Sequence, residues 1–173
     1  MDLKKYIANV PNFPKKGIIF RDITPLLLNG EAFNYVIEKF AEFAKQTGAN
    51  IIVGPEARGF IFGTPVAAKL NLGFVPIRKP GKLPRTTVCI DYELEYGKNT
   101  LCVHEDALIP GDKVLIIDDL LATGGTAHAA CKLVEKAGAE VVGIAFVIDL
   151  VDLNGRQALE DYNVLSLIEF EGE

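Results

Sequence analysis

The sequence has few of the residues that build disulfide frameworks, metal sites and membrane spans. Its three cysteines, Cys89, Cys102 and Cys131, are an odd number without a CxxC spacing, so we expect neither a disulfide framework nor a zinc ribbon. The two histidines, His104 and His128, have no cysteine or histidine partners at ligand spacing, and no metal site is predicted from them. No apolar run approaches the roughly 20 residues that a membrane helix needs.

Positive charge is also scarce. The chain has 18 Lys and Arg against 23 Asp and Glu, a net charge of −5, which argues against nucleic-acid binding by bulk charge. The first residues lack the apolar stretch of a secretory signal peptide. With 173 residues, 49% of them hydrophobic, the chain is long and apolar enough for a substantial core. We therefore expect a single domain over residues 1–173, a cytoplasmic enzyme or binding protein with reduced thiols and no membrane partner.

Apolar runs alternate with helical patterns along most of the chain. Strands that are apolar throughout must be covered on both faces, so this alternation predicts an α/β fold around a central, mostly parallel sheet flanked by helices. The expected strands cover residues 50–54, 73–77, 113–118, 140–148 and 164–167. The expected helices cover residues 31–46, 58–70 and 126–137.

Two segments depart from this alternation. Residues 11–25 are rich in Pro and Gly, yet they carry Phe20 beside Arg21. Residues 86–108 alternate loosely between apolar and polar and predict a β-hairpin or flap inserted between sheet strands. Irregular segments on a rigid α/β scaffold are where sites tend to lie, so we expect a hood over residues 1–30 that recognises a ligand and a β flap over residues 86–108.

The most specific local pattern follows the apolar strand that starts near residue 113. Asp118 and Asp119 end this strand, and an Ala-Thr-Gly-Gly-Thr loop over residues 122–126 then opens a helix. Successive N–H groups of such a loop form a phosphate pocket with the helix N-terminus, and the hydroxyls of Thr123 and Thr126 can donate as well. Adjacent carboxylates suit the hydroxyls of a polyol or a magnesium shell. The loop is neither GxxxxGK[ST] nor GxGxxG, which disfavours a P-loop or a dinucleotide fold.

This pattern resembles the phosphoribosyl-diphosphate (PRPP) signature of the type I phosphoribosyltransferases. Other segments resemble the adenine-specific members of that family, in the same order along the chain: Asn12 to Pro14, Gly17 to Pro25, Gly54 to Phe60, Ile77 to Pro84 and Leu94 to Gly97. The resemblance covers nearly the whole chain. It implies the type I phosphoribosyltransferase fold and the transfer of a 5-phosphoribosyl group from PRPP to adenine, giving AMP and pyrophosphate in purine salvage. It also implies Mg²⁺ carried mainly by PRPP, with no direct metal ligand from the protein, and a homodimer.

The resemblance also assigns roles to residues. Those expected to hold the 5-phosphate are Ala122, Thr123, Gly124, Gly125 and Thr126. Those expected on the pyrophosphate side are Glu56, Ala57, Arg58, Arg78, Lys79 and Lys82, with a cis peptide bond expected between Glu56 and Ala57. Those expected around adenine are Ile19, Phe20, Arg21 and Leu120.

Four residues carry the expected chemistry. Asp118 and Asp119 would hold the ribose hydroxyls, and nearby carboxylates stabilise the positive charge of an oxocarbenium-like transition state. By resemblance, Glu95 would be the general acid/base that takes the purine N–H proton, and Tyr96 would help to close the site. A closing flap excludes the water that would otherwise hydrolyse PRPP.

Two alternatives to this function stay open. A phosphoribosyltransferase specific for 6-oxopurines or xanthine would share the PRPP site, although the base segment and the Leu-Glu-Tyr-Gly sequence argue against it. A non-catalytic regulator that senses PRPP would usually carry a basic face or a nucleic-acid-binding extension, which the acidic balance disfavours. Phe20, finally, has a purely structural alternative as a core side chain of the hood.

Overall fold

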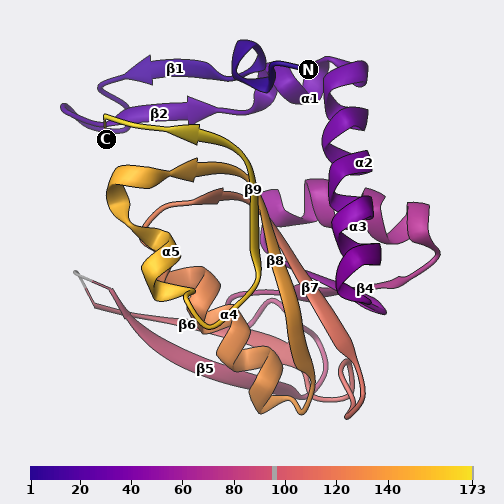
Figure 1. Cartoon of the computed structure of the whole chain (residues 1–173). Helices are drawn as coiled ribbons and strands as arrows, with labels where there is room; N and C mark the ends of the chain where they lie inside the picture. The colour runs from indigo at the N-terminus through magenta and orange to yellow at the C-terminus, as the bar shows by residue number, and fades with distance from the viewer. Residues whose placement is uncertain (95–96, 173) are drawn as a thin grey trace.

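A parallel five-stranded sheet forms the centre of the molecule (Figure 1). The computed structural model describes residues 1–94 and 97–172. In spatial order the strands are β4 (Gly73–Ile77), β3 (Ile51–Pro55), β7 (Lys113–Leu121), β8 (Glu140–Leu150) and β9 (Val164–Phe170). All four neighbouring pairs run parallel, so the carboxyl ends of the strands meet at one edge.

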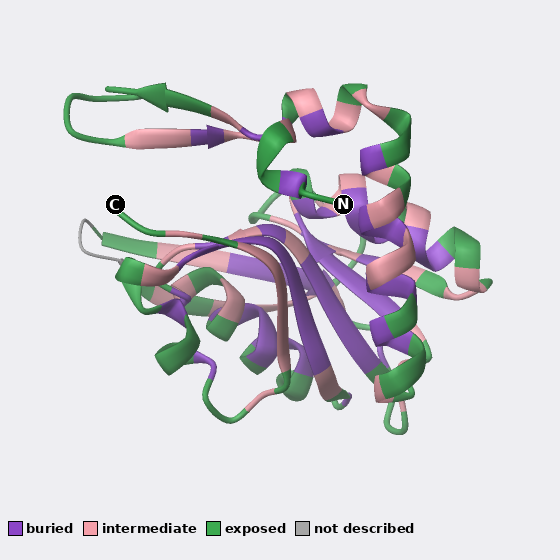
Figure 2. Ribbon diagram, turned by 45° about the horizontal axis from the view of Figure 1, so that its top comes forward, coloured by how far each residue is buried: buried purple, intermediate pink, exposed green. Residues whose placement is uncertain are grey.

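Strand β7 shows why the sheet is covered on both faces. Alternate side chains of a strand point to opposite faces, and those of Leu115 and Ile117 enter one apolar cluster while those of Val114 and Ile116 enter another. The first cluster packs the sheet against α2 (Gly30–Thr47) and α3 (Arg58–Leu70), and the second packs it against α4 (Gly125–Lys136). Figure 2 shows the central strands buried between these helices, whose outer sides are exposed. The expected α/β sandwich is confirmed.

Capping residues determine where α2 begins and ends. The side chain of Asn29 accepts a hydrogen bond from the backbone N–H of Ala32 (2.9 Å) and caps the start of α2. Gly48, with φ of 74°, provides the left-handed residue that ends this helix. The α3 helix has the predicted bounds, whereas β7 continues three residues beyond the predicted end at Asp118, which places both acidic residues within the strand.

The N-terminal segment contains a β-hairpin, formed by β1 (Ala8–Pro11) and β2 (Ile19–Asp22). It lies between a short 3-10 helix, η1 (Leu3–Tyr6), and α1 (Thr24–Leu28). Figure 2 shows the hairpin projecting from the body of the molecule with mostly exposed or half-buried residues. Phe20 and Arg21 therefore lie on a strand, a feature that the Pro and Gly content of this segment conceals.

The expected flap is an antiparallel hairpin of β5 (Thr87–Leu94) and β6 (Gly97–His104). Its strands place Cys89 directly opposite Cys102, and the two form a disulfide. The expectation of three unpaired thiols is therefore wrong for this pair, because strand pairing and not sequence spacing brings the two residues together. Cys131 is free and buried in α4, as expected of a small apolar side chain, and burial raises its thiol pKa to about 12.

Two short elements complete the chain: η2 (Val151–Leu153) and α5 (Gly155–Ala158), both between β8 and β9. Within residues 1–94 and 97–172, no helix combines the length and the apolar character that a bilayer crossing requires. The division into a hood over residues 1–30 and a flap over residues 86–108 stays a prediction.

Replacing Phe62 with Ala should lower the free energy of unfolding by about 3–5 kcal/mol. The Phe62 ring is fully buried and meets the rings of Phe33 and Phe40 edge-on, so its removal leaves a cavity between α2 and α3. Urea unfolding measures the loss. Leu28→Ala is the control, because this side chain is 89% exposed and its loss should change stability by less than about 0.5 kcal/mol. Equal effects of the two substitutions would contradict the described core.

Candidate active site

The loop that joins β7 to α4 exposes the N–H groups of a helix N-terminus. Gly124 precedes α4 with φ of 87°, and no side chain caps the helix there. A Cβ at this position would lie 2.7 Å from the carbonyl oxygen of Gly155, so both the conformation and the space require glycine. The first N–H groups of a helix have no partner within the helix, and their positive dipole end favours an anion. This loop suits a phosphate dianion.

The two acidic residues at the end of β7 have different surroundings. Asp119 is buried, and its Oδ2 lies 2.6 Å from Nε of Arg58, the first residue of α3. Burial raises the pKa of Asp118 well above its usual range, and the adjacent charge of Asp119 raises it further. Asp118 Oδ1 accepts a hydrogen bond from the backbone N–H of Asp119 (2.8 Å). A cationic group entering the site would favour the ionised form of Asp118.

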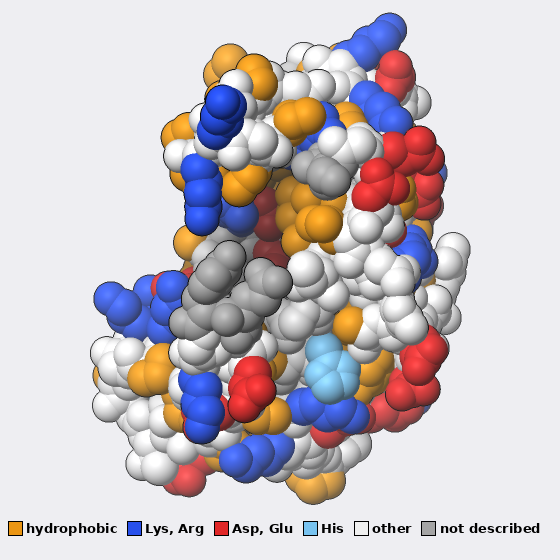
Figure 3. Space-filling model, turned by 90° about the vertical axis from the view of Figure 1, so that its left-hand side faces the viewer, with side chains coloured by type: hydrophobic (Ala, Val, Ile, Leu, Met, Phe, Trp, Pro, Cys, Tyr) orange, Lys and Arg blue, Asp and Glu red, His pale blue; other side chains and the backbone are white. Residues whose placement is uncertain are grey.

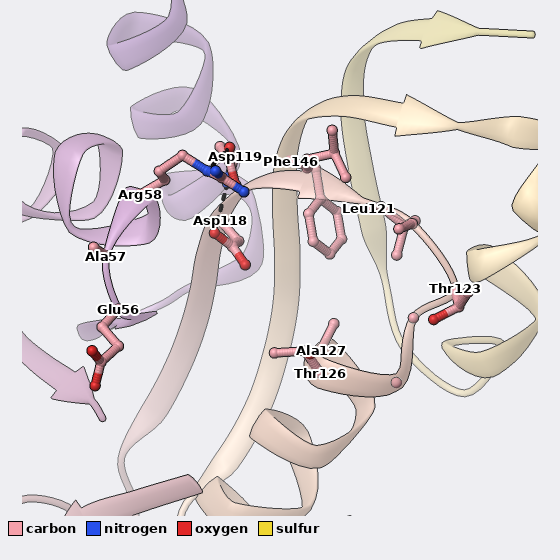
Figure 4. A pocket seen from close by; sticks show the side chains of 14 residues that line it. Glu56, Ala57, Arg58, Asp118, Asp119, Leu121, Thr123, Thr126, Ala127 and Phe146 are labelled. Carbon is pink, nitrogen blue, oxygen red and sulfur yellow. Dashed lines mark hydrogen bonds and ion pairs between the residues drawn. The ribbon is translucent and has the colours of Figure 1, made fainter. Parts of the chain in front are cut away.

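A cavity of about 420 Å³ opens over these groups (Figure 4). It extends from the peptide between Glu56 and Ala57 to the N-terminus of α4, with the two aspartates between them. The ring of Phe146 forms part of its wall, because β8 places Phe146 opposite Asp118 in the sheet register. The lining residues are Glu56, Ala57, Arg58, Asp118, Asp119, Leu120, Leu121, Ala122, Thr123, Gly124, Gly125, Thr126, Ala127 and Phe146.

A second cavity of about 410 Å³ lies beneath the β1–β2 hairpin and shares two residues with the first, Arg58 and Asp119. Its lining is mainly apolar: Val10, Phe13, Phe20, Arg21, Asp22, Ile23 and Thr24, besides the two shared residues. Figure 3 shows this face of the molecule hollowed, with acidic side chains at the floor of the hollow and apolar ones beside it. An anion-binding cavity thus adjoins one suited to a flat apolar group.

Phe20 and Arg21 line the second cavity in different ways. The half-buried ring of Phe20 packs edge-on against Phe13 with centroids 5.2 Å apart. Arg21 is buried, donates from Nη1 to Oδ1 of Asn9 (2.6 Å) and stacks over the ring of Phe170 at 4.3 Å. Arg21 therefore also ties the hairpin to the end of β9.

The other two residues expected near a base lie apart from this cavity's lining. Ile19 pairs with Pro11 in the hairpin, and Leu120 lines the first cavity.

Glu56 organises the expected pyrophosphate side. The peptide bond between Glu56 and Ala57 is cis, as predicted. Glu56 Oε1 accepts a hydrogen bond from the backbone N–H of Lys79 (2.7 Å) and lies 3.4 Å from Nε of Arg78. The hydrogen bond from Lys79 N–H is the main cause that lowers the pKa of Glu56, and the charge of Arg78 lowers it further. Figure 4 shows its carboxylate turned away from the two aspartates. Glu56 therefore orients the cationic segment after β4, and Arg58 supplies the positive charge in the lining of the cavity.

Not all expected cations lie in the cavity. Arg78, Lys79 and Lys82 follow β4, outside the described lining, and the two lysines are exposed. Glu95 and Tyr96 fall outside the described residues, so their roles stay predictions. The neighbouring strand β5 does reach the phosphate loop, because the hydroxyl of Tyr92 lies 3.3 Å from that of Thr126.

The sequence did not identify the apolar residues that line the two cavities. Phe146 sits inside a buried strand that reads as core, and only the register of β8 against β7 brings it to the site. Val10, Phe13 and Ile23 are equally inconspicuous before the hairpin is known. The phosphate loop and the acidic pair, by contrast, are contiguous in sequence and could be found there.

Asp118→Asn should raise the stability of the protein at neutral pH. The pKa of Asp118 is raised in the folded state, so its carboxylate costs stability above the ordinary Asp pKa and none below it. The stability gained from Asn should therefore shrink as the pH falls from the raised pKa of Asp118 in the folded protein to the ordinary Asp pKa. Unfolding free energies against pH measure it.

Asp119→Asn is the matched control for this prediction and should not stabilise the protein, because it breaks the ion pair with the half-exposed Arg58. A loss of stability at neutral pH in Asp118→Asn, or a gain independent of pH, would contradict the assigned environment of Asp118.

Comparisons with known proteins agree with this geometry. Residues 27–172 match the phosphoribosyl transferase domain. The adenine phosphoribosyltransferase of Halothermothrix orenii is 57% identical over 169 residues, which cover 98% of this chain and 99% of that protein. The crystal structure of adenine phosphoribosyltransferase from Thermoanaerobacter pseudethanolicus is 51% identical, with a TM-score of 0.93 over 98% of each chain.

A third similar protein is the Saccharomyces cerevisiae adenine phosphoribosyltransferase, complexed with an imino-altritol bisphosphate and adenine. It is 39% identical, with a TM-score of 0.91 over 96% of this chain and 97% of that chain. The loop, the acidic pair and the fold thus occur together in a chain that resembles these enzymes over nearly its full length. This chain belongs to the phosphoribosyl transferase family, in its adenine phosphoribosyltransferase branch.

Proposed function

We propose that this protein transfers the 5-phosphoribosyl group of PRPP to adenine, giving AMP and pyrophosphate in purine salvage. One observation carries the proposal. An anion-binding cavity and an apolar cavity adjoin and share Arg58 and Asp119, so a phosphorylated sugar and a purine can meet between them. The yeast relative was crystallised with a bisphosphate sugar analogue and adenine, a pair of ligands with this division of chemistry.

The ribose 5-phosphate occupies the loop over residues 122–126. The N–H groups at the start of α4 and the hydroxyls of Thr123 and Thr126 donate to its oxygens. Asp118 and Asp119 accept from the ribose hydroxyls. As the bond to pyrophosphate breaks, positive charge develops on the sugar, and the two carboxylates stabilise it in a site with little access to water.

The pyrophosphate lies on the side of the cavity formed by Glu56, Ala57 and Arg58. Arg58, paired with Asp119 in this structure, bridges the leaving group and the acidic pair. Arg78, Lys79 and Lys82 add positive potential beside it. Glu56 orients the first two through its contacts with Lys79 N–H and Arg78 Nε.

Magnesium would be carried mainly by PRPP and would supply charge neutralisation at the leaving group. Asp118 and Asp119, which line the cavity, are hard oxygen donors that suit the surroundings of such an ion without having to ligate it. Among the residues that the structure describes, no group of three or more Asp, Glu, His and Cys side chains forms a separate metal site.

Adenine enters the cavity under the β1–β2 hairpin. The ring of Phe20, which lines this cavity, stacks on the purine. Backbone groups near Ile19, the residue before Phe20 in β2, distinguish a 6-amino from a 6-oxo group by the placement of donors and acceptors. Arg21 holds the hairpin in position, and Leu120 lies at the junction with the sugar. Glu95 removes the purine N–H proton as the nitrogen attacks C1′, and Tyr96 closes over the site.

The protein acts as a cytoplasmic homodimer, with residues 78–82 near the subunit interface. This part of the proposal rests on the family resemblance alone. Light scattering at assay concentration tests the dimer, and a monomer there would contradict it.

AMP formation tests the function directly. With Mg²⁺ and PRPP, adenine should give AMP, whereas hypoxanthine and guanine should give at most about 1% of that rate, because a site with donors and acceptors placed for one base leaves buried groups unpaired with another. Chromatography of the nucleotide products measures this. Activity with oxopurines only would keep the PRPP site and overturn the assignment of the base cavity.

Glu95→Gln separates catalysis from binding. It should lower kcat by about 10²-fold or more, the usual contribution of a general base, while the Kd for PRPP changes little. Glu93→Gln is the matched control, because this neighbouring acid of β5 has no assigned role. Equal kcat values for the two variants would contradict the role of Glu95, and PRPP binding without turnover in the unaltered protein would indicate a PRPP sensor.

A further inference from the structure

The phosphate loop rests on a segment that lies outside the cavity. This segment, residues 151–158, contains η2 and α5 and follows the end of β8. A Cβ on Gly155 would collide with the carbonyl oxygen of Ala122 and lie 2.7 Å from Cδ1 of Leu121. In return, a Cβ on Gly124 would lie 2.7 Å from the carbonyl oxygen of Gly155 and 2.9 Å from Cβ of Ala158. The two backbones thus pack closely on each other, with side-chain atoms of Leu121 and Ala158 beside the contact.

Arg156 fixes the position of that segment. Its Nε donates to Oδ2 of Asp149 (2.9 Å), its Nη2 to Oγ of Ser166 (2.7 Å) and its Nη1 to the carbonyl oxygen of Val164 (3.3 Å). The first partner belongs to β8 and the other two to β9. A planar guanidinium with several fixed donors holds such a set of acceptors in one geometry, which the single ammonium of lysine cannot do.

The ion pair of Arg156 and Asp149 lies at the same level of the sheet as the 122–126 loop. Asp149 is 1% exposed and pairs with Leu121 in the register of β7 and β8, one residue before the loop begins. The pair joins a buried carboxylate to a half-exposed guanidinium, and its net stabilisation is small, because desolvation of the carboxylate offsets most of the attraction. Its specific effect here is to orient the residue next to Arg156, namely Gly155, against the carbonyl of Ala122.

We propose that Gly155 and Arg156 are positioning residues for the 5-phosphate of PRPP and AMP. Through their backbone contact they set the depth and the orientation of the 122–126 loop, so that its N–H groups converge on one phosphate. Neither residue lines the described cavity, and both act through the loop. The proposal rests on the proposed placement of the 5-phosphate in that loop.

The test is a selective loss of affinity for the 5-phosphate. Arg156→Met keeps most of the length of the side chain and removes the guanidinium. It should raise the KM for PRPP and the Kd for ribose 5-phosphate by about 10- to 100-fold, the cost of displacing a binding group by a fraction of an ångström to an ångström. The kcat at saturating PRPP, the KM for adenine and the Kd for pyrophosphate should change by less than about threefold, which is under 1 kcal/mol. Steady-state kinetics and isothermal titration calorimetry supply these values.

Further variants separate positioning from general destabilisation. Arg156→Lys and Ser166→Ala each keep part of the bond set and should give smaller shifts of the same kind, and Gly155→Ala should give a large one. These carry the test if Arg156→Met fails to fold. Val36→Ala is the matched control, because it removes buried volume in α2 on the other side of the sheet and should leave the KM for PRPP unchanged.

Two outcomes overturn the proposal. One is a folded Arg156→Met or Gly155→Ala protein with an unaltered Kd for ribose 5-phosphate. The other is a similar loss for adenine, pyrophosphate and ribose 5-phosphate, which a purely structural role would produce. Thr126→Ala tests the underlying placement separately. If it leaves ribose 5-phosphate binding unchanged, the placement in the loop is wrong; if it weakens binding and Arg156→Met does not, only the positioning role fails.

Discussion

The ion pair between Arg58 and Asp119 connects the start of α3 to the end of β7 and thereby joins the walls of both cavities. It forms because α3 lies unusually close to the sheet. A Cβ on Gly59 would lie 2.9 Å from the carbonyl oxygen of Ile117, so only glycine permits this approach. One arginine then faces two adjacent carboxylates, and burial together with Asp119 raises the pKa of Asp118. In the proposed reaction, this arrangement would favour positive charge on the bound sugar.

The parallel sheet explains why anion-binding and cation-stabilising groups can lie so close together. Carboxyl ends of neighbouring strands meet at one edge, and helices begin there with their positive dipole ends toward the same space. The phosphate loop leads into α4, while Arg58 opens α3 on the other face. The negative aspartates sit between these two helix starts. A phosphorylated sugar that becomes cationic in the transition state matches this alternation of charge.

The sequence alone predicted those parts of the site whose residues are contiguous in the chain. The loop over residues 122–126, the acidic pair and the helix that starts at Arg58 each combine residue types that only a few structures require together. The cis bond after Glu56 could be expected only from the family resemblance.

The features that sequence missed depend on pairing in three dimensions. Cys89 meets Cys102 because two antiparallel strands share a register, and Phe146 reaches the cavity because β8 pairs with β7. Gly155 looks like an ordinary turn glycine until its backbone is seen against Ala122. Strand register and backbone contacts are set by the packing of the whole sheet, so no local sequence pattern predicts them.

A crystal structure of the complex with AMP would locate phosphate, ribose and base in one experiment. We expect the phosphate about 3 Å from the backbone N–H groups at residues 124–126, the ribose hydroxyls at Asp118 and Asp119, and the purine beneath the β1–β2 hairpin beside Phe20. A phosphate bound instead at the Glu56–Ala57 peptide, with the ribose away from the two aspartates, would contradict the proposed placement.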